Sequence, residues 1–250
     1  IRNDIVDIVL LSMTCTFAYL CYTVISNNNS MTFSWTNFCG FGMNFEIDGF
    51  RAIYGLIAVV ICILAHVFGK EYFKKTKDSN RYYLFNLITL CGTIGVLISS
   101  DLFTTFVFFE IMSMASVPWV LERETSSALK AGGTYLAVAI IGGLLVLMGI
   151  GIIYAETNTL SFNMLFLMKT EAASSRMWLG GILAVLGFGA KACLFPLHIW
   201  LPETYDKAPA PATALLSSIL TKTGVFGILV ISIYVLGDKD FGMMIFVGGI

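Results

Sequence analysis

Seven long apolar runs follow one another in this sequence. A helix needs about 20 residues to cross the hydrocarbon core of a bilayer. A series of such runs with almost no polar faces cannot be buried in one water-soluble core, so the sequence predicts an all-α polytopic membrane protein. The predicted spans are residues 5–25, 50–69, 82–100, 102–121, 131–155, 178–201 and 212–236.

Composition excludes the main alternatives to a membrane protein. Hydrophobic residues make up 57% of the chain and charged residues only 12%, whereas an ordinary soluble domain has about 25% charged residues. The net charge of −1 provides no basic field for a nucleic-acid partner. The six cysteines form no CxxC pair, which argues against a disulfide scaffold, a zinc site or an iron–sulfur cluster. We therefore expect neither a metal ion nor another cofactor in this chain.

We expect residues 1–250 to form a single transmembrane domain that is an internal piece of a longer protein. The chain begins with Ile1 rather than Met, and an eighth apolar run starts only at Phe241. That run is about half the length of a spanning helix. The last helix, and any ion conduction, are therefore expected to need residues beyond this chain.

Basic residues predict the orientation in the membrane. The loop 70–81 holds five lysine or arginine residues, whereas the Asn/Ser-rich loop 26–49 holds none. By the positive-inside rule, the first loop is cytoplasmic and the second is a polar external loop. We therefore expect residue 1 on the cytoplasmic side of a prokaryotic cell membrane, with the lipid bilayer around the spans.

Three ionisable residues lie inside predicted spans instead of in loops. Glu110, Lys191 and Lys222 each lie in a different span, away from its ends. An ionisable group at bilayer depth costs at least a few kcal/mol, so each should face protein or water and have a partner. On its own helix, Glu110 shares a face with Ser113, and Lys222 shares one with Ser218. These hydroxyls can hold water or relay a proton.

Two interpretations of these three residues remain open. A buried ion pair can simply lock helices together, and one glutamate with one lysine would suit that structural role. Two lysines and one carboxylate, however, leave an uncompensated charge, and burial disfavours the charged form of a lysine. A lysine that can lose its proton suits proton transfer better than helix locking, so a proton route is the favoured interpretation.

The span that carries Lys191 also contains signals of a broken helix. Pro196 cannot donate to the carbonyl of Ala192, and Pro202 is predicted to end the run. A break at membrane depth is tolerated only where protein or water satisfies the freed backbone groups, and transporters place ion sites at such breaks. His198 lies between the two prolines, and it is either a proton relay or an ordinary histidine at a helix end.

Three further features have structural interpretations. Asp101 is expected to cap the helix that begins at Leu102. His66 lies near the cytoplasmic end of its span and is expected to be interfacial. Small residues in the span 131–155 predict close helix packing. They are Gly133, Gly142, Gly143, Gly149 and Gly151.

The block from Gly189 to Leu229 resembles the most diagnostic stretch of a known family of antiporter-like, proton-conducting membrane subunits. That family includes large membrane-arm subunits of respiratory complex I, their counterparts in energy-converting hydrogenases and the large subunits of Mrp-type Na⁺/H⁺ antiporters. Its pattern is a lysine, then P-x-H-x-W-L-P, then A-P-x-P, then a second lysine followed by a glycine. Here these are Lys191, residues 196–202, residues 208–211, and Lys222 with Gly224. The segments FFEIMSMAS and NFEIDGF also match the family's glutamate-bearing helix and its short external motif.

The resemblance implies a fold with two inverted five-helix repeats, each containing one broken helix. This chain then corresponds to the first repeat, over residues 82–236, and lacks the second. By position, Glu110 resembles the family's key glutamate, Lys191 the lysine of the broken helix, and Lys222 the connecting lysine that follows. Because the glutamate tunes its partner lysine in this family, Glu110 and Lys191 are expected to approach each other directly or through one water.

The implied function is translocation of protons, with Na⁺/H⁺ antiport as a variant, along a buried Glu–Lys–Lys axis in a multisubunit energy-coupling complex. Other membrane subunits of the complex would be the partners, and any redox centres would lie in those partners. Tyr205, where complex I members often carry His, favours Mrp-type or hydrogenase-linked relatives. The alternatives are a structural membrane subunit and a stand-alone transporter for an organic solute. A solute transporter predicts a polar cavity, whereas the polar residues here are sparse and mostly titratable.

Overall fold

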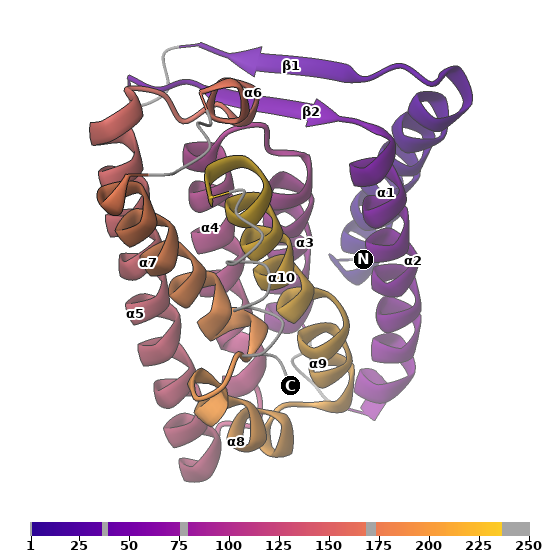
Figure 1. Ribbon diagram of the computed structural model, residues 1–250. Helices are drawn as coiled ribbons and strands as arrows, with labels where there is room; N and C mark the ends of the chain where they lie inside the picture. The colour runs from indigo at the N-terminus through magenta and orange to yellow at the C-terminus, as the bar shows by residue number, and fades with distance from the viewer. Residues whose placement is uncertain (1, 37–39, 76–79, 169–173, 237–250) are drawn as a thin grey trace.

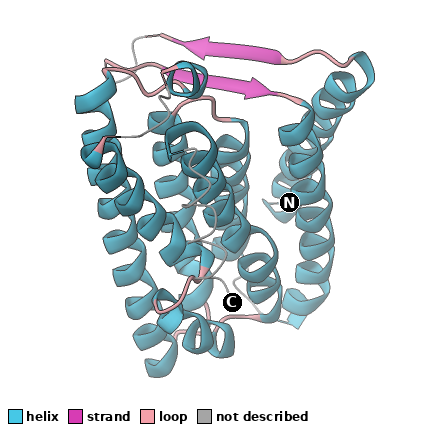
Figure 2. Ribbon diagram, in the orientation of Figure 1, coloured by secondary structure: helices cyan, strands magenta, loops and turns pink. Residues whose placement is uncertain are grey.

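The computed structural model describes residues 2–36, 40–75, 80–168 and 174–236, and most of them are helical (Figures 1 and 2). Long helices lie side by side, and a two-stranded sheet lies across one end of the bundle. The apolar run after Phe241 falls outside the described residues. The predicted spans are confirmed as Val6–Asn27, Gly49–Tyr72, Asn80–Ile98, Leu102–Leu121, Ser126–Thr157, Ser175–Lys207 and Ala210–Leu236.

The first five spans are single helices, and the last two are composite. The span Ser175–Lys207 contains two helices joined by a short 3₁₀ turn, and the span Ala210–Leu236 contains two π-helical segments. The helices are α1 (Arg2–Asn27), α2 (Gly49–Tyr72), α3 (Asn80–Ile98), α4 (Leu102–Leu121), α5 (Ser126–Thr157), α6 (Phe162–Leu167), α7 (Ser175–Ala192), α8 (Trp200–Lys207), α9 (Ala210–Leu215) and α10 (Thr221–Val230). The 3₁₀ segments are η1 (Phe73–Lys75) and η2 (Leu197–Ile199), and the π-helical segments are η3 (Leu216–Leu220) and η4 (Ile231–Leu236).

The loop between the first two spans is more ordered than the sequence predicted. It contains an antiparallel hairpin of β1 (Met31–Trp35) and β2 (Met43–Ile47), in which Phe33 lies opposite Phe45. Both strands alternate apolar and polar residues, the period of a strand with two different faces. The Asn/Ser-rich stretch before them favoured a plain loop, and the alternation was too short to stand out against the apolar spans.

Asp101 caps α4, as predicted, and also anchors the hairpin. Its Oδ1 accepts a hydrogen bond from the backbone N–H of Thr104 at 2.7 Å, and its Oδ2 accepts one from the N–H of Asn44 at 3.1 Å. The short connection around Asp101 also pairs with the segment before α6, where the N–H of Leu102 donates to the carbonyl of Leu160. This end of the bundle is therefore held by bonds among three separate segments.

Close contact between α5 and α7 depends on glycine. A Cβ atom on Gly149 would lie 2.5 Å from the carbonyl oxygen of Gly180, which is closer than real atoms approach. The two backbones therefore touch in the way that small residues allow in membrane proteins. The packing prediction is wrong for Gly133 and Gly151, because no described atom lies within 4 Å of a Cβ at either position.

The predicted helix break is present, but Pro202 does not make it. Helix α7 ends at Ala192, and Cys193 follows in the left-handed conformation with φ of 65°. The Phe195–Pro196 peptide bond is cis, and η2 then leads into α8. Contrary to the prediction, Pro202 lies inside the first turn of α8. Its missing N–H costs little there, because the first N–H groups of a helix have no partner within the helix.

Candidate functional site

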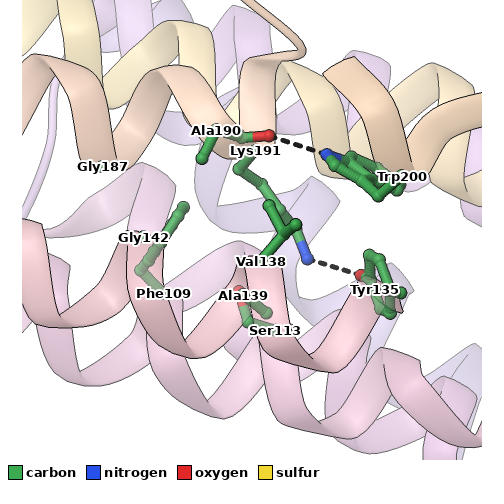
Figure 3. Close-up of a pocket in the computed structure, with 10 residues that line it drawn as sticks. All are labelled: Phe109, Ser113, Tyr135, Val138, Ala139, Gly142, Gly187, Ala190, Lys191 and Trp200. Atoms are coloured by element: carbon green, nitrogen blue, oxygen red, sulfur yellow. Dashed lines mark hydrogen bonds between the residues drawn. The ribbon is translucent and has the colours of Figure 1, made fainter. Parts of the chain in front are cut away.

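Lys191 lies in the last turn of α7, directly before the helix break, and is only 4% exposed. Its Nζ donates a hydrogen bond of 2.5 Å to the hydroxyl of Tyr135 on α5 (Figure 3). A cation is also favoured at a helix C-terminus. The hydroxyl oxygen of Tyr135 and the end of α7 therefore both place negative partial charge near the nitrogen of Lys191.

The hydroxyl of Tyr135 has a second partner on α4. It lies 2.5 Å from Oγ of Ser116, and that serine donates to the carbonyl oxygen of Ser113 at 2.7 Å. Tyr135, Ser113 and Ser116 are each at most 1% exposed. Side chains and one carbonyl from α7, α5 and α4 thus form one continuous hydrogen-bonded chain.

A cavity of about 10 Å³ lies beside Lys191, which is close to the space that one water molecule needs. Trp200, the first residue of α8, closes one side of it, and its Nε1 donates to the carbonyl oxygen of Ala190 at 2.9 Å (Figure 3). The break after α7 therefore lets the chain fold back over the lysine. The residues around the cavity are Phe109, Ser113, Tyr135, Val138, Ala139, Gly142, Gly187, Ala190, Lys191 and Trp200.

Glu110 lies on α4, one turn before Ser113, and packs against α5. A Cβ atom on Gly143 would be 2.2 Å from Oε1 of Glu110, so the missing side chain of this glycine makes room for the carboxyl group. Oε1 is buried and has no hydrogen-bond partner among the described residues, and the same holds for Oγ of Ser113. No ion pair joins Glu110 to Lys191 within the described part of the chain, although the charge of Lys191 acts on the carboxyl group. The direct contact expected from the resemblance is not made, and a contact through water stays a prediction.

Lys222 lies in a different environment from Lys191. It is the second residue of α10 and is exposed on the described part of the chain. Its Nζ donates to the carbonyl oxygen of Ser217 at 2.7 Å, within the π-helical segment η3, and lies 3.4 Å from Oγ1 of Thr221. It borders a cavity of about 410 Å³, which is otherwise lined by Tyr54, Ile57, Ala58, Ile61, Leu97, Ser218, Ile219 and Thr223.

The two predicted relay residues stay apart from the chain at Lys191. Ser218 borders the same cavity as Lys222, as their shared helix face predicted, but its hydroxyl donates to the carbonyl oxygen of Ala214 at 2.5 Å. His198 lies in the 3₁₀ turn η2, with its ring stacked on Phe195 at 5.7 Å. Their relay roles therefore stay predictions.

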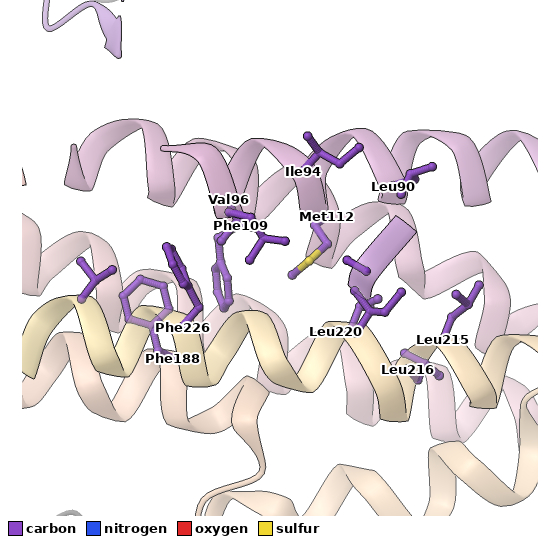
Figure 4. Close-up of a cluster of buried hydrophobic side chains, with 14 of the residues drawn as sticks. Leu90, Ile94, Val96, Phe109, Met112, Phe188, Leu215, Leu216, Leu220 and Phe226 are labelled. Carbon is purple, nitrogen blue, oxygen red and sulfur yellow. The ribbon is translucent and has the colours of Figure 1, made fainter. Parts of the chain in front are cut away.

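Apolar side chains fill the space between α3, α4, α7 and α10 (Figure 4). Phe109 on α4 meets Phe188 on α7 edge to face, with ring centres 5.0 Å apart. Lys191 and Lys222 share no hydrogen-bond partner among the residues that the structure describes.

A second polar cluster joins α1 to α2. His66 is only 4% exposed, and its predicted position at the membrane interface stays a prediction. Its Nε2 lies 2.7 Å from Oδ1 of Asp7, and Lys70 pairs with the other oxygen of that carboxylate. The side chain of Tyr83 on α3 covers the histidine ring. The cluster places the start of α1 beside the end of α2, as alternating spans require.

Sequence reasoning missed Tyr135 and Ser116. Both lie in runs that were interpreted as packing, and nothing in their spacing relates them to Lys191. The one available signal was chemical, because a tyrosine inside a membrane span needs a partner for its hydroxyl. That signal predicts a hydrogen bond without saying which of the other spans provides it.

The geometry defines a class of protein: a polytopic membrane protein with a broken helix, a buried lysine beside the break and an unpaired carboxyl group on a neighbouring helix. Ionisable groups at membrane depth mark ion and proton pathways. Residues 99–249 match the family described as NADH:quinone oxidoreductase/Mrp antiporter, TM. The chain belongs to that family.

Individual relatives agree with this assignment. The chain is 30% identical over 189 residues to a Na⁺/H⁺ antiporter subunit of Bacillus subtilis, covering 75% of this chain and 38% of that protein. Its fold resembles a chain of the membrane-bound sulfane sulfur reductase, an archaeal respiratory membrane complex, with a TM-score of 0.82, 26% identity and coverage of 91% of this chain and 47% of that chain. It also resembles a chain of the Mrp complex from Dietzia sp. DQ12-45-1b, with a TM-score of 0.80, 22% identity and coverage of 93% and 45%. The chain thus spans less than half the length of these relatives, which are subunits of multisubunit membrane complexes.

Proposed function

We propose that this chain is the ion-translocating part of an Mrp-type Na⁺/H⁺ antiporter subunit, and that protons pass through Glu110, Lys191 and Lys222. The observation that carries the proposal is the environment of Lys191. This lysine is 4% exposed in a membrane span, and its partner is a hydroxyl rather than a carboxylate. No carboxylate among the described residues pairs with Lys191, so the group is not fixed in an ion pair.

Glu110 is the partner proton site in this proposal. Its buried Oε1 has no hydrogen-bond partner among the described residues, so protonation would give it a stable neutral form. The charge of Lys191 acts on this carboxyl group, so the charge state of one residue affects the other. Such coupling is what lets two sites exchange protons in sequence rather than hold them permanently.

Lys222 passes the proton onward. Lys222 lies in the span Ala210–Leu236, is exposed in the described part of the chain and borders the cavity of about 410 Å³. A charged group at that depth has to meet protein or water. The match covers only 38% of the relative from Bacillus subtilis, and we assign the covering groups and the exit route to the remainder of such a longer protein.

The proposed setting is a prokaryotic cell membrane, with residue 1 on the cytoplasmic side. Protons, with Na⁺ as the exchanged ion, are the substrates, and other membrane subunits of the same complex are the partners. The relative from Bacillus subtilis, named as a Na⁺/H⁺ antiporter subunit, supports the choice of ions. The basic residues of the loop 70–81 support the orientation.

The test is Lys191→Ala in the full-length subunit, within its complete complex reconstituted in liposomes. Addition of Na⁺ should drive proton movement that a pH-sensitive dye reports in the wild type, and the variant should lose it while the complex still assembles. Lys74→Ala is the matched control, because Lys74 lies on the surface and pairs only with Glu71 among described residues. Exchange at the wild-type rate in Lys191→Ala would favour a structural subunit instead.

A further inference from the structure

The hydrogen-bonded chain at Lys191 has a defined direction. A serine or tyrosine hydroxyl has one proton to donate. Ser116 donates its proton to the carbonyl oxygen of Ser113, so in its contact with Tyr135 it must accept. Tyr135 therefore donates to Ser116 and has only lone pairs left for Lys191, whose Nζ is the donor.

This direction favours one charge state of the lysine. With its proton turned toward Ser116, Tyr135 presents only oxygen lone pairs to the nitrogen of Lys191. A lone pair accepts a stronger hydrogen bond from an ammonium group than from a neutral amine. If the hydroxyl rotated to donate to Lys191, it would instead stabilise the neutral amine and lose its bond to Ser116. The hydroxyl of Tyr135 thus has two orientations that correspond to the two protonation states of the lysine.

Helix α5 also keeps the lysine and the carboxyl group apart. Tyr135 holds Lys191, and Gly143, roughly 12 Å further along the helix axis, accommodates Glu110. No ion pair joins the two charged groups within the described residues. One helix therefore provides a separate position for each group.

We infer that Tyr135 is a positioning residue: its hydroxyl accepts the hydrogen bond from Lys191 and holds that amino group away from Glu110, and Ser116 sets the direction in which the hydroxyl points. This inference rests on the proposed function. Among the described residues, Tyr135 bonds to Lys191, and the charge of Lys191 acts on Glu110 of α4 and on Cys193 directly after α7. Lys222 of α10 also acts on Cys193.

The test is Tyr135→Phe in the full-length subunit within its complete complex, with Na⁺-driven proton movement measured as a function of pH. The variant keeps the ring, including its contact with Trp200 at 4.9 Å between ring centres. It removes the acceptor for the ammonium group together with the bond to Ser116, so the pH dependence of exchange should move about one unit toward lower pH. Tyr154→Phe on the same helix is the control, because Tyr154 is 38% exposed and should tolerate the change.

Ser116→Ala provides a second variant with a small change in volume. It removes the acceptor that holds the proton of Tyr135 away from Lys191, so the pH dependence should move in the same direction by a smaller amount. If Tyr135→Phe does not assemble, Ser116→Ala decides the question alone. A purely structural role of these hydroxyls would lower the amount of complex but leave the pH dependence of the remaining exchange unchanged.

Two results separate this inference from the proposed function. If Lys191→Ala abolishes exchange but Tyr135→Phe and Ser116→Ala keep the wild-type pH dependence, the positioning role is wrong and the proton route stands. If Lys191→Ala exchanges ions at the wild-type rate, the proposed function fails first. A shift in both hydroxyl variants, with none in Tyr154→Phe, supports the positioning role.

Discussion

Lys191 and Lys222 belong to the same block of sequence, yet the fold gives them opposite environments. Lys191 is buried at the end of an α-helix and bonds to a side-chain hydroxyl from another helix. Lys222 is exposed after a π-helical segment and bonds to a carbonyl of its own span. The local backbone accounts for the difference. Helix α7 ends in a left-handed residue that lets Trp200 fold over the first lysine, whereas η3 turns the carbonyl of Ser217 toward the second.

The comparison shows that the two lysines differ in the hydrogen bonds that their partners can make. A hydroxyl can rotate and serve either protonation state, so it suits a site that changes charge. A backbone carbonyl can only accept, so it always favours a donor. We therefore expect a substitution of Lys191 to reduce ion exchange more than the same substitution of Lys222.

The largest effect is expected for Lys191→Met. The variant fills nearly the same volume without a charge, so exchange should fall by about 100-fold or more. The melting temperature of the complex should stay the same or rise, because a buried ammonium group is replaced by an apolar side chain. Exchange assays and thermal unfolding of the purified complex test both statements. Lys222→Met should cause the smaller loss of exchange, and the reverse order would overturn the comparison.

Lys222→Arg should come next. Arginine keeps the positive charge but does not deprotonate in a protein, so the variant separates charge from proton transfer. We expect assembly to be normal and exchange to fall by roughly 10-fold or more. The rate of Na⁺-driven proton movement is the measurement. If Lys222→Arg exchanged at the wild-type rate, the lysine would be a fixed charge and not a proton site.

Gly143→Ala tests the pocket for the carboxyl group. The new Cβ would meet Oε1 of Glu110 at 2.2 Å, so either the helices or the carboxyl group must move, at a cost of about 1–3 kcal/mol. The melting temperature should fall and exchange should decrease severalfold. Gly151→Ala on the same helix is the control, because no described atom lies within 4 Å of its Cβ. Equal effects of the two substitutions would mean that Gly143 serves the helix rather than Glu110.

The smallest effect is expected for Thr221→Val. The hydroxyl of Thr221 donates to the carbonyl of Ser217 at 2.9 Å and lies 3.4 Å from Nζ of Lys222. Its loss should cost about 0.5–1.5 kcal/mol in thermal unfolding and leave exchange nearly unchanged. A loss of exchange as large as that of Lys222→Arg would show that the hydroxyl takes part in proton transfer.

Several properties follow from the sequence alone, and their physical cause is local. Bilayer thickness determines how long an apolar run must be, so all seven spans could be located from hydropathy. The cost of burying a charge singles out Glu110, Lys191 and Lys222 without any knowledge of the fold. The capping role of Asp101 and a helix break near Pro196 depend on neighbouring residues only, and both are present.

Tertiary structure decided which groups meet. Tyr135 becomes the partner of Lys191 only because α5 packs against α7, and Gly143 faces Glu110 only because α4 packs against the same helix. The hairpin of β1 and β2 is stabilised by bonds to Asp101, which is distant in the sequence. Proline illustrates the same limit, because Pro196 and Pro202 have identical chemistry, but one lies at the break and the other in the first turn of α8. Hydropathy and charge are properties of single segments, whereas hydrogen-bond partners depend on the packing of several helices at once.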